Sequence, residues 1–253
     1  MIYDYEPSGV DASWQAVESD SPCRTFRIEY TSPAPSVHPE SDRVVCYYFA
    51  PKTRRSRRAV LFFHGMGRFS FRPLLSFPRK LAELGVPALF LVLPCHFERA
   101  PGDRPGGTQI LRDDLETTLG DFRQAVLDAR AALDLMEAHG LGPASFTALG
   151  VSFGGMIATI TAAVDRRVRG AVLAATAGNM LRILPASPIT RRFVSQDALQ
   201  RLRRRAGTDH RPAHEQYRRY VHALPSPRAL DPTSPLDQLA LIDPLTFAPM
   251  LRD

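Results

Sequence analysis

The chain has 253 residues, of which 44% are hydrophobic and 23% are charged, and its formal net charge is +6. This composition is typical of a globular protein with one large domain, or at most two, and excludes a disordered, collagen-like or disulfide-stapled chain. The sequence also shows no internal repeat.

The three cysteines, Cys23, Cys46 and Cys95, cannot all pair, and none lies in a Cys/His cluster of the kind that holds structural zinc. The first eleven residues carry acidic side chains and show no signal-peptide pattern, so we expect a cytoplasmic protein. The longest uncharged stretch, residues 146–164, is interrupted by three glycines and predicts a strand, a turn and a helix instead of a membrane span. We expect no cofactor and no metal.

Positive charge is concentrated in residues 182–219, which contain ten arginines against three acidic residues. A second basic run, residues 52–58, lies between two apolar segments and predicts a solvated hairpin turn. Neither run has interleaved aromatic residues or a recognisable nucleic-acid recognition element, so we expect no nucleic-acid partner.

Hydrophobic patterns along the chain predict an α/β fold. Residues 24–30 and 43–50 predict two antiparallel strands, whereas the continuous apolar runs at 59–63 and 86–93 are typical of strands buried on both faces of a parallel sheet. Further strands are expected at 145–149 and 169–175. Helices are expected at 73–84, 110–138 and 154–164. This order implies a mostly parallel sheet flanked by helices.

Beyond Gly178 the pattern changes to short helical pieces separated by prolines. We therefore divide the chain into a core, residues 1–178, with six strands, and a basic helical cap, residues 179–253. The alternative for the second part is a loosely ordered tail.

The most informative motif is Gly150-Val151-Ser152-Phe153-Gly154, a G-x-S-x-G pattern between a predicted strand and a predicted helix. In a nucleophile elbow the glycines are needed because side chains beside the serine would collide with the neighbouring strand and helix. Ser152 would then be exposed at a helix N-terminus, where backbone N–H groups favour negative charge. The alternative is a glycine-rich turn with an incidental serine.

A second motif, His64-Gly65-Met66-Gly67, directly follows the predicted strand at 59–63. A sharp turn there would direct the Met66 N–H at an oxyanion, while the Phe153 N–H supplies the second donor. Together the two motifs predict acyl transfer.

On these residues the chain resembles the α/β-hydrolase superfamily over about residues 43–177, and is most similar to serine esterases and dienelactone-hydrolase-like members. Residues 93–99 resemble the loop after the fourth strand in that family. The resemblance implies that Ser152 is the nucleophile, that Met66 and Phe153 are the oxyanion donors, and that an acid and a histidine follow later in the chain.

In that family the acid and the histidine follow a seventh and an eighth strand. Residues 242–251 resemble the segment that leads into the seventh strand, and no apolar run follows it before Asp253. We therefore expect an incomplete sheet in a truncated hydrolase, whose acid and histidine are not evident. The three histidines after Ser152 are the remaining candidates for a base that must come within about 3 Å of the serine hydroxyl. They are His210, His214 and His222.

Other polar residues near the motifs are expected to be structural. We expect His64 to order the oxyanion loop and His96 to be a loop residue. Asp113, Asp114 and Glu116 fit the first turn of a helix, where its dipole favours acidic residues, and are not interpreted as a metal site.

Three hypotheses therefore remain. The chain is a weak or inactive truncated hydrolase of small carboxylic esters or related acyl compounds, or an active hydrolase with a cap histidine in a rearranged triad. Alternatively, it is a non-catalytic binding domain in which a partner chain covers the open edge of the sheet.

Overall fold

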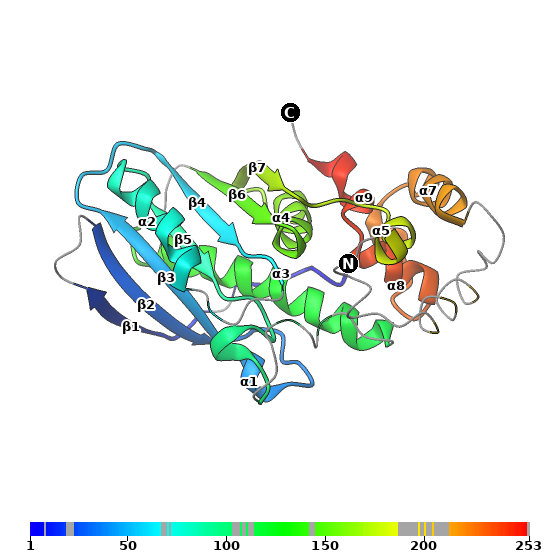
Figure 1. The fold of residues 1–253 in the computed structure, drawn as a ribbon, viewed down its shortest axis with the longest axis horizontal. Helices are drawn as coiled ribbons and strands as arrows, with labels where there is room; N and C mark the ends of the chain where they lie inside the picture. Colours follow the sequence, from blue (N-terminus) through cyan, green and yellow to red (C-terminus); the bar gives the residue numbers. More distant parts are fainter. Residues whose placement is uncertain are drawn as a thin grey trace.

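The structure is a computed structural model with one seven-stranded sheet, in the order β1-β2-β3-β5-β4-β6-β7 (Figure 1). The residues that it describes are 1–7, 9–18, 23–66, 70, 72–102, 107, 110, 114–141, 145–186, 197, 200, 204 and 213–251.

The first half of the sheet is antiparallel. It contains β1 (Ala12–Glu18), β2 (Cys23–Thr31) and β3 (Arg43–Pro51), with the short helix α1 (Pro39–Asp42) between the last two. The sequence predicted β2 and β3 but not β1, whose mixed polar composition carries little strand signal. The described core residues thus supply a seventh strand beyond the six that were expected.

The second half of the sheet is parallel and contains the two sequence motifs. It consists of β5 (Ala88–Leu91), β4 (Arg58–Phe63), β6 (Ser145–Val151) and β7 (Val168–Ala174). In β4, Phe63 pairs with Leu91 on one side and with Gly150 on the other, so the loop after β4 and the turn after β6 leave the sheet side by side. The mostly parallel α/β sheet that the sequence predicts is confirmed.

The prediction of a hairpin at the basic run 52–58 is wrong. Strand β5 lies between β3 and β4 and is antiparallel to the first and parallel to the second. The basic segment therefore crosses over the end of β5 instead of joining two paired strands. The apolar flanks alone cannot reveal this, because strand order depends on pairings distant in the sequence.

Helices cover both faces of the sheet. On one face lies α2 (Ser76–Glu83), preceded by the 3₁₀ turn η1 (Arg72–Leu75). On the other lie α3 (Leu115–Ala138) and α4 (Phe153–Val164), which pack with the inward side chains of β3 to β5 into the larger core (Figure 1). Helix α3 begins later than its apolar pattern predicts, because the Asp114 carboxylate caps it by accepting the Glu116 and Thr117 N–H groups.

The C-terminal region forms short helices at one end of the molecule (Figure 1). They are α5 (Met180–Ala186), α7 (Ala213–Ala223), α8 (Pro235–Ile242) and α9 (Pro244–Phe247), with the 3₁₀ turns η4 (Pro227–Ala229) and η5 (Ala248–Met250). Helix α8 packs on α3, and α9 packs on α4. Most of the arginine-rich part of residues 182–219 lies outside the described residues.

Strands β1 and β7 form the two edges of an open sheet. On β7, Val172 is 51% exposed and Leu173 is 41% exposed, although both belong to an apolar strand of the parallel half. Among the helices that the structure describes, none combines the length and apolar character required to cross a bilayer.

Candidate active site

Ser152 occupies a sharp turn between β6 and α4. Its φ is +54° and its ψ is −119°, a conformation that L-residues rarely adopt and that is concentrated at functional sites. The Ser152 N–H donates to the Ala174 carbonyl at 2.8 Å, which ties the turn to the end of β7. The G-x-S-x-G sequence thus has the strand, strained turn and helix that a nucleophile elbow requires.

The glycines of this motif are required by close backbone contacts. A Cβ on Gly154 would lie 2.3 Å from the Phe63 carbonyl oxygen and 2.4 Å from that of His64. A Cβ on Gly150 would lie 2.4 Å from the Gly154 carbonyl oxygen. Both positions therefore exclude any side chain, and the first brings α4 directly against the end of β4.

The loop after β4 lies against this turn. A Cβ on Gly65 would be 3.4 Å from the Ser152 Cβ and 3.3 Å from the Val151 carbonyl oxygen. Among the described residues, no backbone carbonyl accepts the Met66 N–H, and none outside α4 accepts the Phe153 N–H. Gly67, the last residue of the His-Gly-Met-Gly motif, lies outside the described residues.

His64 is a neutral, buried residue that orders this loop. Its Nε2 accepts the Leu93 N–H at 3.0 Å, so the ring proton is on Nδ1, which lies 2.9 Å from the Gly65 carbonyl oxygen and donates to it. Burial, reinforced by the neighbouring His96, holds the pKa of His64 well below its usual range. Protonation would place a hydrogen on Nε2, where it would clash with the hydrogen that the Leu93 N–H donates to the same atom. His64 is therefore not a proton acceptor here.

His96 lies beside the same loop in the segment that follows β5. Its Nδ1 is 2.8 Å from the Pro94 carbonyl oxygen, and its ring stacks at 6.1 Å from the Phe153 ring. Burial lowers the pKa of His96 to about 4. Nε2 has no hydrogen-bond partner among the described residues and faces Gly107, where a Cβ would lie 2.2 Å away. The His96 ring thus packs between the rings of His64 and Phe153.

The described cap histidines make no hydrogen bond to Ser152. His214 lies on α7, where its carbonyl accepts from the Asn179 side chain at 2.9 Å, and His222 is exposed on the same helix. His210 lies outside the described residues. Within the described part of the chain, the Ser152 Oγ therefore has no partner that would serve as its base.

Comparison with known proteins identifies the family. A family model described as the alpha/beta hydrolase family matches residues 60–252, which is well over half of the chain. The chain belongs to the alpha/beta hydrolase family. No curated protein matches this alpha/beta hydrolase.

Among solved structures, two acetyl xylan esterases share its fold. The enzyme from Paenibacillus sp. R4 has 16% identity and a TM-score of 0.55, over 99% of this chain and 73% of that one. Acetyl xylan esterase 1 from Thermoanaerobacterium sp. JW/SL YS485 has 15% identity and a TM-score of 0.55, over 97% and 71%. A cold-adapted esterase from an Arctic intertidal metagenomic library has 22% identity and a TM-score of 0.49, over 64% of each chain. The chain thus spans less than two thirds of that esterase and under three quarters of the other two proteins.

Asp243 is a buried carboxylate that the sequence analysis did not single out. It accepts the Asn179 N–H at 2.9 Å, the Met180 N–H at 2.6 Å and the Leu245 N–H at 2.9 Å, and the Tyr217 hydroxyl donates to it at 3.0 Å. Burial raises its pKa, and these hydrogen bonds oppose the rise. The signal that could have found it is an aspartate directly before Pro244, which is typical of a helix N-cap.

The acidic residues at the start of α3 have a structural role. Asp114 is the cap of α3, and Glu116 lies in the first helical turn, while Asp113 is outside the described residues. Within the described ranges, no three His, Cys, Asp or Glu side chains form a group that could hold a metal ion.

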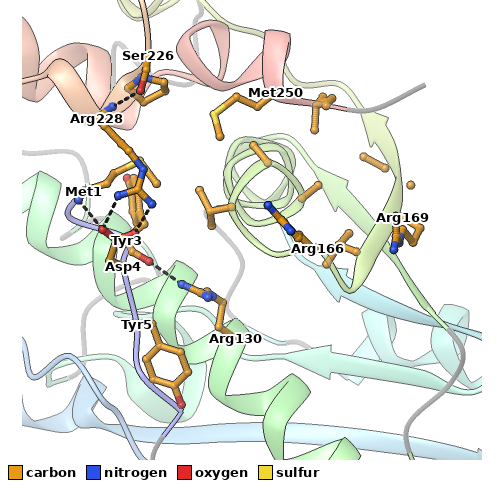
Figure 2. Close-up of a pocket in the computed structure, with 18 of the residues that line it drawn as sticks. Met1, Tyr3, Asp4, Tyr5, Arg130, Arg166, Arg169, Ser226, Arg228 and Met250 are labelled. Carbon is orange, nitrogen blue, oxygen red and sulfur yellow. Dashed lines mark hydrogen bonds and ion pairs between the residues drawn. The ribbon is translucent and has the colours of Figure 1, made fainter.

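A hollow of about 900 Å³ lies beside β7 and away from the elbow. It is bounded by the N-terminal segment, the end of α4, β7 and the C-terminal segment (Figure 2). On one wall Arg228 forms two hydrogen bonds with Asp4, at 2.9 and 3.0 Å, and Arg130 donates to the Tyr3 carbonyl at 2.7 Å. Its lining includes neither Ser152 nor the described part of the loop after β4, so this hollow is separate from the candidate active site.

Proposed function

We propose that this alpha/beta hydrolase cleaves small carboxylic esters or related acyl compounds with Ser152 as its nucleophile. The observation that carries the proposal is the strained Ser152 backbone, at a φ of +54°, with Gly65 packed against it. Esterases with the same fold are consistent with this reaction class.

In the proposed reaction the Ser152 Oγ attacks the substrate carbonyl carbon and gives its proton to a base. The carbonyl oxygen becomes an oxyanion, which the Met66 and Phe153 N–H groups stabilise. Collapse of this intermediate expels the alcohol, which takes up a proton, and leaves an acyl group on Ser152 that water then releases. The glycines Gly65, Gly150 and Gly154 allow the backbones to approach closely enough for this arrangement.

We place the reaction in the core, residues 1–178, and substrate selection in the cap, residues 179–253. Because no described histidine contacts Ser152, we expect weak hydrolysis from this chain by itself. A triad hydrolase that lacks its base and acid retains only the oxyanion and binding contributions, on the order of a thousandfold over water.

The experiment that tests the proposal is labelling with a fluorophosphonate, followed by intact mass measurement. These reagents phosphonylate an activated serine and largely ignore an ordinary one. Because the strained turn and the two oxyanion donors activate Ser152 only in part, we expect one adduct to form slowly on the native chain and none on Ser152→Ala. The two proteins should have matching circular dichroism spectra. An adduct that persists on Ser152→Ala would place the nucleophile elsewhere.

The second candidate function is a non-catalytic domain whose β7 edge pairs with a partner chain. It is favoured by the exposed Val172 and Leu173 side chains and by the hollow beside the same strand. Under this alternative, folded native chain and Ser152→Ala would both stay unlabelled by the fluorophosphonate.

A further inference from the structure

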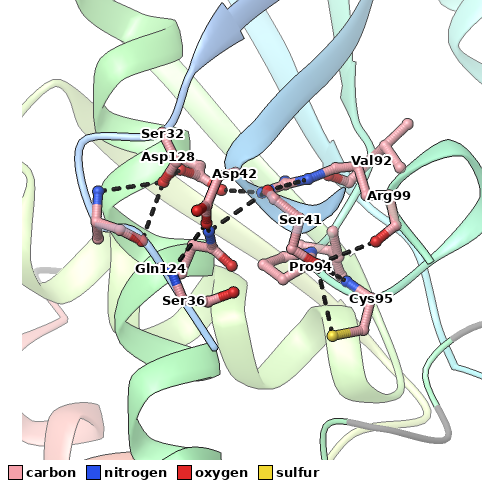
Figure 3. Close-up of polar contacts among 12 residues, drawn as sticks. Ser32, Ser36, Ser41, Asp42, Val92, Pro94, Cys95, Arg99, Gln124 and Asp128 are labelled. Atoms are coloured by element: carbon pink, nitrogen blue, oxygen red, sulfur yellow. Dashed lines mark hydrogen bonds and ion pairs between the residues drawn. The ribbon is translucent and has the colours of Figure 1, made fainter. Parts of the chain in front are cut away.

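Arg99 is a completely buried cation in the segment after β5, within the 3₁₀ turn η2 (Phe97–Arg99). Its Nη1 donates to the Val92 carbonyl at 2.7 Å, its Nε donates to the Ser41 carbonyl at 2.9 Å, and its Nη2 pairs with the Asp128 carboxylate at 2.6 Å (Figure 3). Asp128 is equally buried on α3 and also accepts the Ser32 hydroxyl at 2.5 Å.

A buried ion pair of this kind is weak evidence for stability. The desolvation of two charges is costly, and apolar residues of similar volume often stabilise a fold as well or better. A role other than stability is indicated by the groups that Arg99 binds. Hydrogen bonds connect them, in two steps, to the candidate oxyanion hole.

The first step of this connection is the Val92–Leu93 peptide. The guanidinium of Arg99 holds the carbonyl oxygen of this peptide, and the N–H of the same peptide donates to His64 Nε2 at 3.0 Å. In a planar trans peptide the carbonyl and the N–H point in opposite directions. Arg99 therefore fixes the N–H that selects the ring tautomer of His64.

The second step is the Gly65–Met66 peptide. His64 Nδ1, which carries the ring proton, donates to the Gly65 carbonyl oxygen at 2.9 Å. The N–H on the other side of that peptide belongs to Met66. The donors thus all point in one direction, from the Arg99 cation through two peptides and one imidazole to the Met66 N–H.

We propose that Arg99 is a positioning residue that orients and polarises the Met66 N–H through His64. Successive hydrogen bonds with one direction polarise and strengthen each other in a medium of low dielectric constant. The role in an oxyanion hole rests on the proposed function, whereas the hydrogen-bond relay itself does not.

Two further contacts hold the relay rigid. The Ser41 hydroxyl accepts the Cys95 N–H at 2.8 Å and donates to the Arg99 carbonyl at 3.0 Å (Figure 3). Within this segment Cys95 and Phe97 both have positive φ values, of 58° and 50°. Such a backbone persists only where its surroundings determine it, and the contacts of Arg99 and Ser41 supply that determination.

Nuclear magnetic resonance of the full chain, labelled with ¹⁵N in histidine and methionine, tests the relay without requiring activity. In the native protein we expect the Nδ1–H tautomer of His64. In Arg99→Met we expect an upfield shift of the Met66 amide proton and fluorophosphonate labelling about 10- to 100-fold slower, because a misaligned oxyanion donor loses much of its effect. Arg99→Lys should show both changes in smaller degree, since one ammonium cannot replace the guanidinium contacts.

The matched control is Arg167→Met. Arg167 also pairs with α3, at 2.5 Å from Asp134, but its hydrogen bonds and ion pairs to described residues do not include the segment after β5. We expect this variant to lose stability without a change in the Met66 amide shift or the labelling rate. It therefore separates the relay from a general loss of stability.

An Nε2–H tautomer of His64 in the native protein would overturn the proposal, and this measurement needs no variant to fold. A native Met66 shift in both Arg99 variants, or a shifted amide with an unchanged labelling rate, would also overturn it. If the native chain is not labelled at all, the proposed function fails, while the tautomer and the Met66 shift still decide whether the relay exists.

Discussion

The backbone around Ser152 is packed tightly against carbonyl oxygens of neighbouring segments. The Phe63 and His64 carbonyls approach Gly154 so closely that no Cβ fits, and Gly65 lies against the serine side chain. The strain at Ser152 is retained because β6, α4 and the end of β4 together leave the turn no other conformation. A single added methyl group at Gly154 would therefore disturb the turn at Ser152.

Gly154→Ala tests this constraint. We expect a loss of unfolding free energy of about 3 kcal/mol or more, because backbone must shift to admit the methyl group. Denaturant unfolding of the full chain measures it. The control is Gly120→Ala on α3, where a Cβ meets nothing within 4 Å, and where alanine should stabilise the helix by about 0.5 to 1 kcal/mol. Equal effects at the two sites would contradict the close packing at Gly154.

Asp243 joins the helices of the C-terminal region to one another. This carboxylate caps α9 and accepts the N–H groups of Asn179 and Met180 at the start of α5, while the Tyr217 hydroxyl of α7 donates to it. Three short helices thus share one buried anion. None of them is long enough to be stable by itself, so their arrangement depends on this contact.

Asp243→Ala should therefore lower the unfolding free energy by about 3 kcal/mol, because it leaves several buried donors without an acceptor. Hydrogen exchange should show the largest loss of protection in α5, α7 and α9. Asp231→Ala is the control, since Asp231 is exposed and its contacts to Thr233 are local. Uniform loss of protection across the sheet would contradict a role confined to these helices.

At the scale of the whole molecule, β7 is the least protected part of the sheet. No described strand pairs with its outer edge, and its large apolar side chains Val172 and Leu173 are exposed. Met250, which is 37% exposed, lines the adjoining hollow. Both faces of a parallel strand are normally covered by helices. The β7 edge is therefore the part of the sheet with which a strand of another chain could pair.

We expect the purified chain to associate through this edge as its concentration rises. Light scattering after size-exclusion chromatography should show a mass that increases with concentration for the native chain and stays monomeric for Leu173→Lys, because edge charges block strand addition. Val37→Lys is the control, since Val37 is 65% exposed but lies in a loop. A monomer at all concentrations, or equal effects of both substitutions, would exclude the edge as an association surface.

The local parts of the site could be predicted from the sequence. The G-x-S-x-G motif and the His-Gly-Met segment depend on contacts between chain neighbours and on glycine conformation, so the composition of a few residues indicates the turn that they form. The same holds for the long helix α3 and for the buried strands, because the hydrophobic pattern of consecutive residues indicates both kinds of element. In each case the determining interactions span only a few positions.

The strand order, the Asp243 contacts and the Arg99–Asp128 pair were decided by the tertiary structure alone. Asp243 meets Asn179 across 64 positions of the chain, and Arg99 meets Asp128 across 29. No sequence periodicity connects such residues. They come together only because of the order in which the strands pair and the position of α3 on the sheet. The sequence thus determined which residues form the sharp turn at Ser152, and the folded chain determined which buried charges and strand edges surround it.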